Sequence, residues 1–137
     1  MSLGVAVVGC GFIGRKRAAT LGAARLVVCA DLNRARAEAL ARTTAFAVAT
    51  DDWRVAVGRT DVDIVAVATT NEMLAEVARA AVEAGKHVIV EKPAARSVAE
   101  SDPLIDAARR AGRLVRVGFN HRYHPALRKA RELLNAG

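Results

Sequence analysis

The stretch Val5-Ala6-Val7-Val8-Gly9-Cys10-Gly11-Phe12-Ile13-Gly14 decides the fold of this 137-residue chain. Its first part is an apolar run rich in β-branched residues, which is typical of a strand buried in a parallel sheet. Glycines then recur in the pattern Gly-x-Gly-x-x-Gly, and Arg15-Lys16-Arg17-Ala18-Ala19 follows with helical composition. We therefore expect a strand, a tight turn and a helix in direct succession.

Each glycine of this pattern has a separate physical role. Gly9 permits the tight turn, Gly11 lets a pyrophosphate approach a backbone without a Cβ, and Gly14 lets the helix lie close on the strand. The helix start also offers unpaired N–H groups and a positive dipole end to phosphates. The motif predicts a dinucleotide site that includes Phe12 and Ile13, although a glycine-rich turn also arises for packing reasons.

A second apolar strand, Leu26-Val27-Val28-Cys29-Ala30, ends in Asp31. This position is close to the spacing of ~20 residues at which an acid binds the adenosine ribose of a dinucleotide. The carboxylate accepts hydrogen bonds from both ribose hydroxyls and repels a 2′-phosphate, so we expect NAD, with NADP as the alternative. Arg34 is the complication, because it could pair with that phosphate or stack on the adenine.

Composition excludes several classes of protein. The length of 137 residues predicts one domain. Hydrophobic residues make up 53% and aromatic residues only 4%, which predicts a core of Val, Ile, Leu and Ala. The net charge of +7 could indicate nucleic acid, but the arginines are spread through helical segments, so we interpret them as solvated helix faces. No apolar segment approaches the ~18 residues of a membrane span. The first apolar run lacks a preceding basic stretch and is the motif strand, so we do not expect it to be a signal peptide. We expect a cytoplasmic protein with Cys10 and Cys29 as small buried hydrophobes.

Strand and helix patterns alternate along the whole chain, which predicts a doubly wound parallel α/β sheet with helices on both faces. The expected strands begin near Val5, Leu26, Ala45, Ile64, His87 and Val115. The expected helices cover residues 33–44, a short turn after Asp51 and Asp52, residues 72–84, a segment from the capping box at Ser97 to Ala111, and residues 125–136. Pro103 conflicts with the fourth helix, whose start could slip to Ser101 or Asp102.

Ligands of such sheets bind beyond the carboxyl ends of the strands, so chemistry is expected where strands end. Besides the glycine turn and Asp31, the candidates are Thr69, Thr70, Asn71, Glu91, Lys92, Pro93, Asn120, His121 and Arg122. His121 and His124 lack a third ligand nearby, so we predict no metal site.

With these strand ends in view, the chain resembles the N-terminal half of the glucose–fructose oxidoreductase, inositol dehydrogenase and rhizopine-catabolism (Gfo/Idh/MocA) family. The resemblance lies in the glycine turn, Asp31, Glu91-Lys92-Pro93 and Gly118-Phe119-Asn120-His121-Arg122-Tyr123-His124-Pro125, and it covers essentially all residues. It implies a Rossmann domain at residues 1–120, then a crossover segment and helix at 121–137. The family's larger α+β substrate domain would begin after Gly137 and is absent.

The resemblance also implies an activity: hydride transfer between NAD or NADP and a sugar, cyclitol or related substrate. It implies that Lys92 polarises or protonates the reacting oxygen, that Glu91 helps hold the nicotinamide and that Arg122 approaches the same side. From the residues alone, the favoured interpretation of Lys92 is a solvated lysine before a turn proline. The family usually carries Pro and His where this chain has Thr70 and Leu74, so we expect a different nicotinamide wall here.

Two hypotheses about function follow. The chain is the cofactor half of an oxidoreductase and inactive alone, or it is a stand-alone dinucleotide-binding module with a regulatory role or a partner subunit. A methyltransferase is a more distant alternative, in which Glu91-Lys92-Pro93 would have no role. Apolar side chains at Leu127, Leu133 and Leu134 predict a surface patch that favours self-association, and hence a homo-oligomer.

Overall fold

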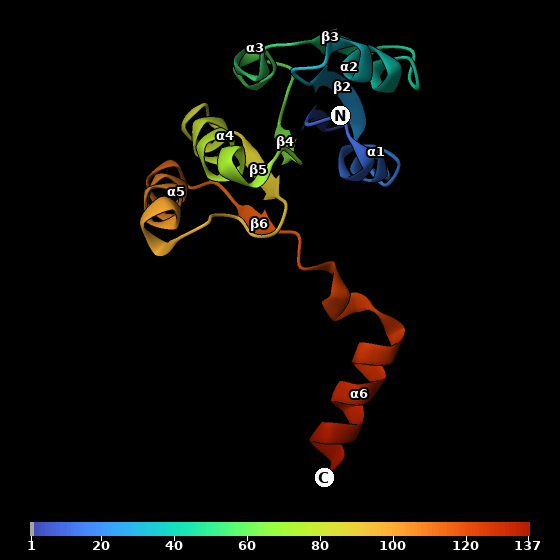
Figure 1. Cartoon of the computed structure of the whole chain (residues 1–137), viewed down its shortest axis with the longest axis vertical. Coiled ribbons are helices and arrows are strands. Elements are labelled where there is room, and N and C mark those ends of the chain that lie inside the picture. The colour runs from blue at the N-terminus through green and yellow to red at the C-terminus, as the bar shows by residue number, and fades with distance from the viewer. Residues whose placement is uncertain (1) are drawn as a thin grey trace.

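A six-stranded parallel sheet forms the centre of the structure, a computed structural model that describes residues 2–137 (Figure 1). The strands are β1 (Gly4–Val8), β2 (Arg25–Ala30), β3 (Val48–Thr50), β4 (Ile64–Val67), β5 (His87–Val90) and β6 (Val115–Val117). The helices are α1 (Phe12–Ala18), α2 (Arg34–Ala41), α3 (Trp53–Gly58), α4 (Asn71–Glu83), α5 (Val98–Ala111), the 3₁₀ turn η1 (Asn120–Tyr123) and α6 (Pro125–Ala136). The strand order β3-β2-β1-β4-β5-β6 confirms the predicted doubly wound α/β fold.

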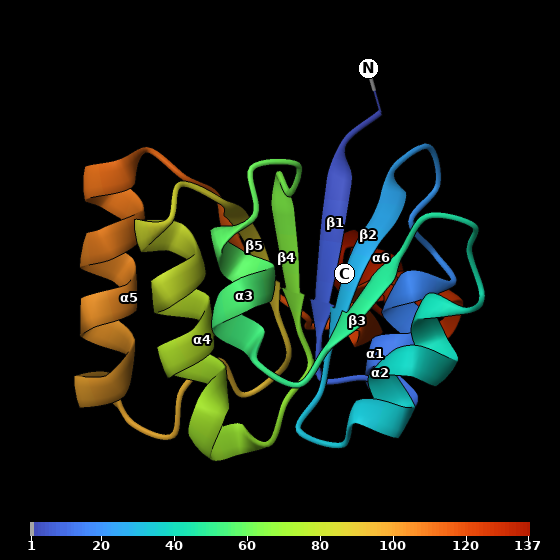
Figure 2. The same ribbon diagram turned by 90° about the horizontal axis from the view of Figure 1, so that it is seen from above.

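The helices form two layers, with α1 and α2 on one face of the sheet and α3, α4 and α5 on the other (Figure 2). Because side chains alternate along a strand, β1 serves both layers. Ala6 and Val8 belong to the core under α3, α4 and α5, whereas Val7 belongs to the core under α1 and α2. This two-sided burial explains why the central strands are continuously apolar.

The prediction for the third strand was wrong at its start. We expected it from Ala45, but only Val48–Thr50 pairs with β2. Thr43 and Thr44 still close the end of α2, since their N–H groups donate to the carbonyls of Leu40 and Ala41. The next residues carry the chain from α2 to the edge of the sheet, where β2 first offers a partner.

Helix α5 begins where the capping box predicted, and the alternative start beside Pro103 was wrong. The Ser97 side chain accepts a hydrogen bond from the N–H of Glu100, and Pro103 lies inside the helix. Glu100 does not complete the box, because its carboxylate accepts from the N–H and the guanidinium of Arg96. Pro103 is tolerated because it lies only in the second turn and the cap holds the first.

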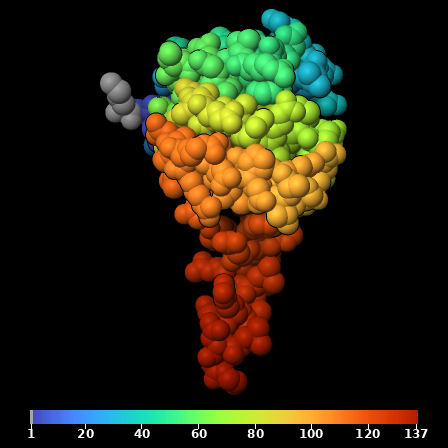
Figure 3. All heavy atoms as spheres, turned by 90° about the vertical axis from the view of Figure 1, so that its left-hand side faces the viewer, coloured from blue at the N-terminus to red at the C-terminus, as the bar shows by residue number. Residues whose placement is uncertain are grey.

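Helix α6 has the predicted bounds and extends away from the body of the domain (Figures 1 and 3). None of its residues is buried. The leucines expected to form an apolar patch are exposed, Leu127 by 52%, Leu133 by 62% and Leu134 by 82%. The exposure of these leucines is therefore confirmed, whereas their role as a patch for self-association stays a prediction.

Removal of the Leu74 side chain tests the packing of α4 on the sheet. Leu74 is 0% exposed in the larger core, so Leu74→Ala should lower the free energy of unfolding by about 2–5 kcal/mol in urea titrations. Leu134→Ala removes the same atoms from a side chain that is 82% exposed and should lower it by less than about 0.5 kcal/mol. Equal losses would contradict the packing described above.

Candidate functional site

The sheet reverses its winding between β1 and β4. The helix after β1 covers one face, and the helix after β4 covers the other, so the chain diverges at the carboxyl ends of these two neighbours (Figure 2). Such a switch point is where doubly wound sheets bind ligands. The predicted residues at the ends of β1, β2, β4, β5 and β6 all lie along this edge.

The glycine turn after β1 shows which glycines the fold needs and which it leaves free. Gly9 has a φ of +91°, and a Cβ there would lie 2.8 Å from the backbone nitrogen of Thr69. A Cβ on Gly14 would strike the carbonyl oxygen of Gly9. Gly11 has an ordinary φ of −71°, and a Cβ there would meet nothing within 4 Å. Packing therefore explains Gly9 and Gly14, whereas Gly11 faces open space where a bound group can approach the backbone.

Helix α1 begins at this open position without a side-chain cap. Gly11 is its N-cap residue and makes no side-chain hydrogen bond, so the first-turn N–H groups are free to donate to a ligand. Phe12 and Ile13 are 70% and 40% exposed beside it. These features are those that a pyrophosphate requires, and they fit the predicted dinucleotide.

Asp31 is held in place at the end of β2. Its Oδ2 accepts a hydrogen bond from the N–H of Cys10 at 2.8 Å, and its Oδ1 accepts one from the N–H of Asn33 at 2.8 Å. The carboxylate thereby ties the glycine turn to the next strand. Each oxygen keeps a free lone pair, so Asp31 can still accept hydrogen bonds from ribose hydroxyls.

Asp31 also lines a cavity of about 310 Å³ between the ends of β1 and β2 and the start of α4. The lining residues are Val8, Gly9, Ala30, Asp31, Leu32, Asn33, Arg36, Asp51, Trp53, Thr69, Thr70, Met73 and Val77. Mostly apolar walls with one fixed carboxylate suit a purine nucleoside. Sequence reasoning missed Trp53 and Met73, because nothing in the linear pattern shows that α3 and α4 lean over the end of β2.

Arg34 does not line this cavity, whereas Arg36 does. The guanidinium of Arg34 contacts Glu38 at 3.1 Å and Asp51 at 4.0 Å. Arg34 and Arg36 are two residues apart on α2, so their side chains point to different sides of the helix. Which of the two faces the cavity depends on the residue at which α2 begins. Arg34 thus forms a surface ion pair in this structure, and its expected contact with adenine or phosphate stays a prediction.

The ends of β5 and β6 bring Glu91, Lys92 and Asn120 together with Arg17. Arg17 Nε donates to Glu91 Oε1 at 2.5 Å, and Arg17 Nη2 donates to Asn120 Oδ1 at 3.3 Å. Lys92 is exposed, and among residues 2–137 no hydrogen bond or ion pair engages its ammonium group. Sequence reasoning missed Arg17, whose partners lie 74 and 103 residues further along the chain.

Thr69, Thr70 and Asn71 form the connection from β4 to α4. Thr70 is the N-cap residue of α4 without a side-chain hydrogen bond, and Thr69 Oγ1 donates to the carbonyl of Thr70 at 3.2 Å. Asn71 begins α4 and is exposed. Leu74, which stands where the family usually carries a His, packs from α4 into the core and is 0% exposed, and the expectation of a different nicotinamide wall stays a prediction.

The two histidines after β6, His121 and His124, lie in η1 and at the start of α6. His124 Nδ1 accepts a hydrogen bond from the N–H of Ala126 at 3.3 Å and so caps α6. His121 and Arg122 are exposed on η1. Within residues 2–137, no group of three or more His, Cys, Asp or Glu side chains could hold a metal ion.

Cys10 and Cys29 are free and buried, as predicted. The Cys10 thiol donates to the carbonyl of Ala30 at 3.4 Å. Contact with the Cys29 thiol, burial and the nearby Asp31 carboxylate raise the pKa of Cys10 far above its usual range. Cys10 is therefore a protonated packing group beneath the turn rather than a nucleophile.

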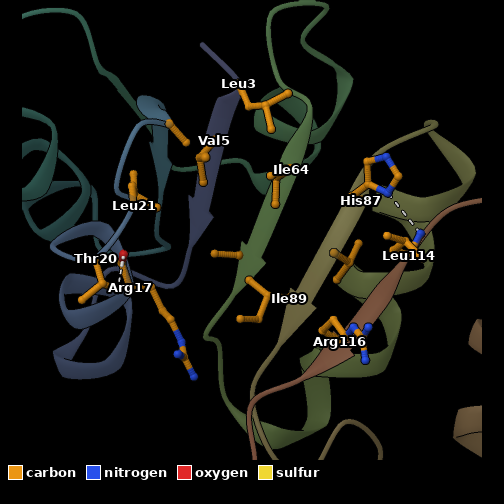
Figure 4. A pocket seen from close by; sticks show the side chains of 13 residues that line it. Leu3, Val5, Arg17, Thr20, Leu21, Ile64, His87, Ile89, Leu114 and Arg116 are labelled. Carbon is orange, nitrogen blue, oxygen red and sulfur yellow. Dashed lines mark hydrogen bonds between the residues drawn. The ribbon is translucent and has the colours of Figure 1, made fainter. Parts of the chain in front are cut away.

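A larger cavity of about 610 Å³ lies on the face of the sheet beside α1 (Figure 4). Val5, Leu21, Ile64 and Ile89 supply apolar walls, and the ring of His87 accepts a hydrogen bond from the N–H of Leu114 at 3.1 Å. This hollow is the part of the sheet that no helix covers. It is away from the glycine turn and Asp31, so we do not assign it to the dinucleotide.

Residues 3–119 match the model of the Gfo/Idh/MocA family, described as "Oxidoreductase family, NAD-binding Rossmann fold". The chain belongs to this family. It is 35% identical to levoglucosan dehydrogenase of Pseudarthrobacter phenanthrenivorans and 32% identical to inositol 2-dehydrogenase of Salmonella paratyphi B, over 99% and 100% of its length. A solved structure of levoglucosan dehydrogenase with NADH and levoglucosan superimposes with a TM-score of 0.87 at 36% identity, over 100% of this chain and 40% of that one.

These comparisons confirm the predicted family, the Rossmann fold and NAD as the cofactor of the domain. The chain spans 38% and 43% of the lengths of the two named dehydrogenases. Among the described residues, none of the helices is both long and apolar enough to span a membrane.

Substitution of Gly11 tests where the pyrophosphate lies. Gly11→Ala places a Cβ in open space, so the free energy of unfolding should change by less than about 1 kcal/mol. The Cβ would displace the pyrophosphate from the backbone N–H groups, and NAD affinity measured by calorimetry should fall about tenfold or more.

Gly58→Ala is the matched control, because its Cβ also meets nothing within 4 Å and α3 ends there, far from the turn. It should leave both measurements unchanged. Undiminished NAD affinity in Gly11→Ala would show that the pyrophosphate does not lie against this turn.

Proposed function

We propose that this chain is the cofactor-binding part of an NAD-dependent dehydrogenase that transfers hydride between nicotinamide and a CH–OH or carbonyl carbon of a sugar or cyclitol. The observation that carries the proposal is the placement of a fixed acid, Asp31, and an unpaired lysine, Lys92, at one edge of the sheet on opposite sides of the switch point. The names of the relatives, levoglucosan dehydrogenase and inositol 2-dehydrogenase, support this substrate class.

The extended dinucleotide would lie across the carboxyl edge of the sheet. Asp31 holds the adenosine ribose, with Arg36 beside it in place of Arg34. The backbone at Gly11 and the start of α1 hold the pyrophosphate. We assign the nicotinamide half to the ends of β4, β5 and β6, which carry Thr69, Thr70, Asn71, Glu91, Lys92, Asn120 and Arg122.

The chemistry divides between cofactor and protein. When bound, the nicotinamide supplies or accepts the hydride. The Lys92 ammonium group donates a hydrogen bond or proton to the substrate oxygen and stabilises negative charge that develops there. It can do so because no acidic side chain among residues 2–137 pairs with it.

Orientation and desolvation of the substrate need further walls. Lys92 and Arg122 are exposed, so the nicotinamide face is open to water in this domain. A substrate must be held at near-attack distance with water excluded for efficient transfer. We therefore propose that residues outside this chain complete the substrate site.

The cytoplasm is the location that we propose. Cys10 and Cys29 are free and buried, which fits a reducing compartment. We also propose a homo-oligomer, formed through the exposed leucines of α6. Measurement of the mass in solution tests that point alone, and a clean monomer would count against the patch and not against the cofactor site.

Replacement of Asp31 tests the choice of cofactor. Asp31→Asn preserves the shape of the side chain but removes the charge that repels a 2′-phosphate. Its NH2 group cannot accept, so one of the two bonds from the N–H groups of Cys10 and Asn33 is also lost. NAD affinity should fall by roughly 10- to 100-fold, because a hydrogen bond to a charged group contributes roughly 1.5–3 kcal/mol. NADP affinity should rise, and calorimetric titration with both cofactors measures the two changes. NADP binding tighter than NAD in the unaltered chain would contradict the assignment.

The stand-alone module is the second candidate function, and the exposure of Lys92 favours it for the chain as it stands. We expect the 137-residue protein to bind NAD without appreciable reduction of NAD in the presence of sugars and cyclitols. Absorbance of NADH measures turnover, and calorimetry in the same buffer establishes binding. Robust turnover by this chain would overturn the need for a second domain, and absence of NAD binding would overturn the proposed function.

A further inference from the structure

Arg17 occupies a position that the glycine motif does not specify. It lies on α1 directly after the turn of helix that holds Gly14, and its side chain is only 19% exposed. Figure 4 shows this side chain extending from α1 along the sheet. An arginine so close to the pyrophosphate turn would be expected to face solvent or phosphate, but this guanidinium points elsewhere.

The guanidinium joins two other strand ends. It forms an ion pair with Glu91, which follows β5, with Nε 2.5 Å from Oε1. Nη1 and Nη2 also lie 3.4 and 3.3 Å from Oδ1 of Asn120, which begins η1 after β6. One side chain thus connects α1 with both segments that border the proposed nicotinamide site.

The ion pair is largely shielded from water and fits closely on the backbone. The Glu91 side chain is only 14% exposed. A Cβ on the buried Gly118 would lie 2.8 Å from Arg17 Nη2 and 2.9 Å from Glu91 Oε2. A shielded charge that loses its partner is strongly unfavourable, so the pair holds its geometry more firmly than an exposed ion pair would.

Glu91 directly precedes Lys92 in the chain. Arg17 holds the Glu91 carboxylate, so the ion pair anchors the segment after β5 from which Lys92 extends.

We propose that Arg17 is a positioning residue for the nicotinamide half of the site. It fixes Glu91 and Asn120 relative to α1 and thereby anchors the segment that carries Lys92. The inference rests on the proposed function, because it takes the ends of β5 and β6 as the nicotinamide side. Arg17 itself is not assigned a contact with the cofactor.

The test compares two ligands that differ at the nicotinamide end. NADH carries the whole dinucleotide, whereas ADP-ribose has the adenosine, the pyrophosphate and the second ribose but no nicotinamide. In Arg17→Met, calorimetry should show NADH binding weakened about five- to tenfold, the size of one ordinary hydrogen bond lost where Glu91 and Asn120 are no longer held beside the nicotinamide, with ADP-ribose binding unchanged. The fluorescence of bound NADH, which reports the surroundings of the nicotinamide, should fall towards that of free NADH.

Two further variants separate positioning from folding. Arg17→Lys keeps the charge but cannot reach Glu91 and Asn120 with a planar fork, so it should restore NADH binding only in part. Arg79→Met is the matched control, because Arg79 is also a helical arginine facing a glutamate, 4.0 Å from Glu83, but on α4. It should alter neither ligand.

The outcomes are distinguishable. Equal weakening of NADH and ADP-ribose in Arg17→Met would overturn the inference, since Arg17 would then support the turn or the fold as a whole. Unchanged binding of both ligands would overturn it as well. If the unaltered chain binds neither ligand, the proposed function fails and the inference fails with it.

Discussion

The hydrogen bond from the Cys10 N–H to the Asp31 carboxylate is the interaction on which the site depends. It joins the glycine turn after β1 to the end of β2 at 2.8 Å, and a second bond from the Asn33 N–H fixes the other oxygen. The turn therefore does not rely on a bound ligand for its shape. The same carboxylate lines the cavity, so one side chain holds the site together and takes part in recognition.

Much of the fold could be predicted because local and long-range preferences agree. The strand at Ile64–Val67 is continuously apolar and lies at the centre of the sheet, and α6 starts at Pro125, where proline is favoured. The predicted element boundaries were wrong where tertiary contacts decide where an element begins. The start of β3 depends on where β2 offers a partner, and Pro103 is accommodated because the Ser97 cap outweighs one missing backbone hydrogen bond.

Only those site residues that directly follow a strand could be predicted from the sequence. Asp31, Lys92 and the glycines follow directly from strand ends, but side chains that reach the site from elsewhere leave no local signal. Arg17 acts on partners 74 and 103 residues away. The burial of Leu74 likewise could not be read from its position after β4, since the face that a residue presents on α4 depends on how the whole helix packs.

Two apolar surfaces of this domain are left uncovered by its own helices. The face of β4, β5 and β6 beside α1 carries no helix, and α6 projects away with its leucines exposed. Burial of such surfaces contributes roughly 25 cal/mol per Å², so each favours a covering partner. The carboxyl edge differs, because its apolar cavity is paired with a fixed carboxylate and free N–H groups. Polar groups fixed at an apolar cavity distinguish a binding site from a surface that only lacks a neighbour.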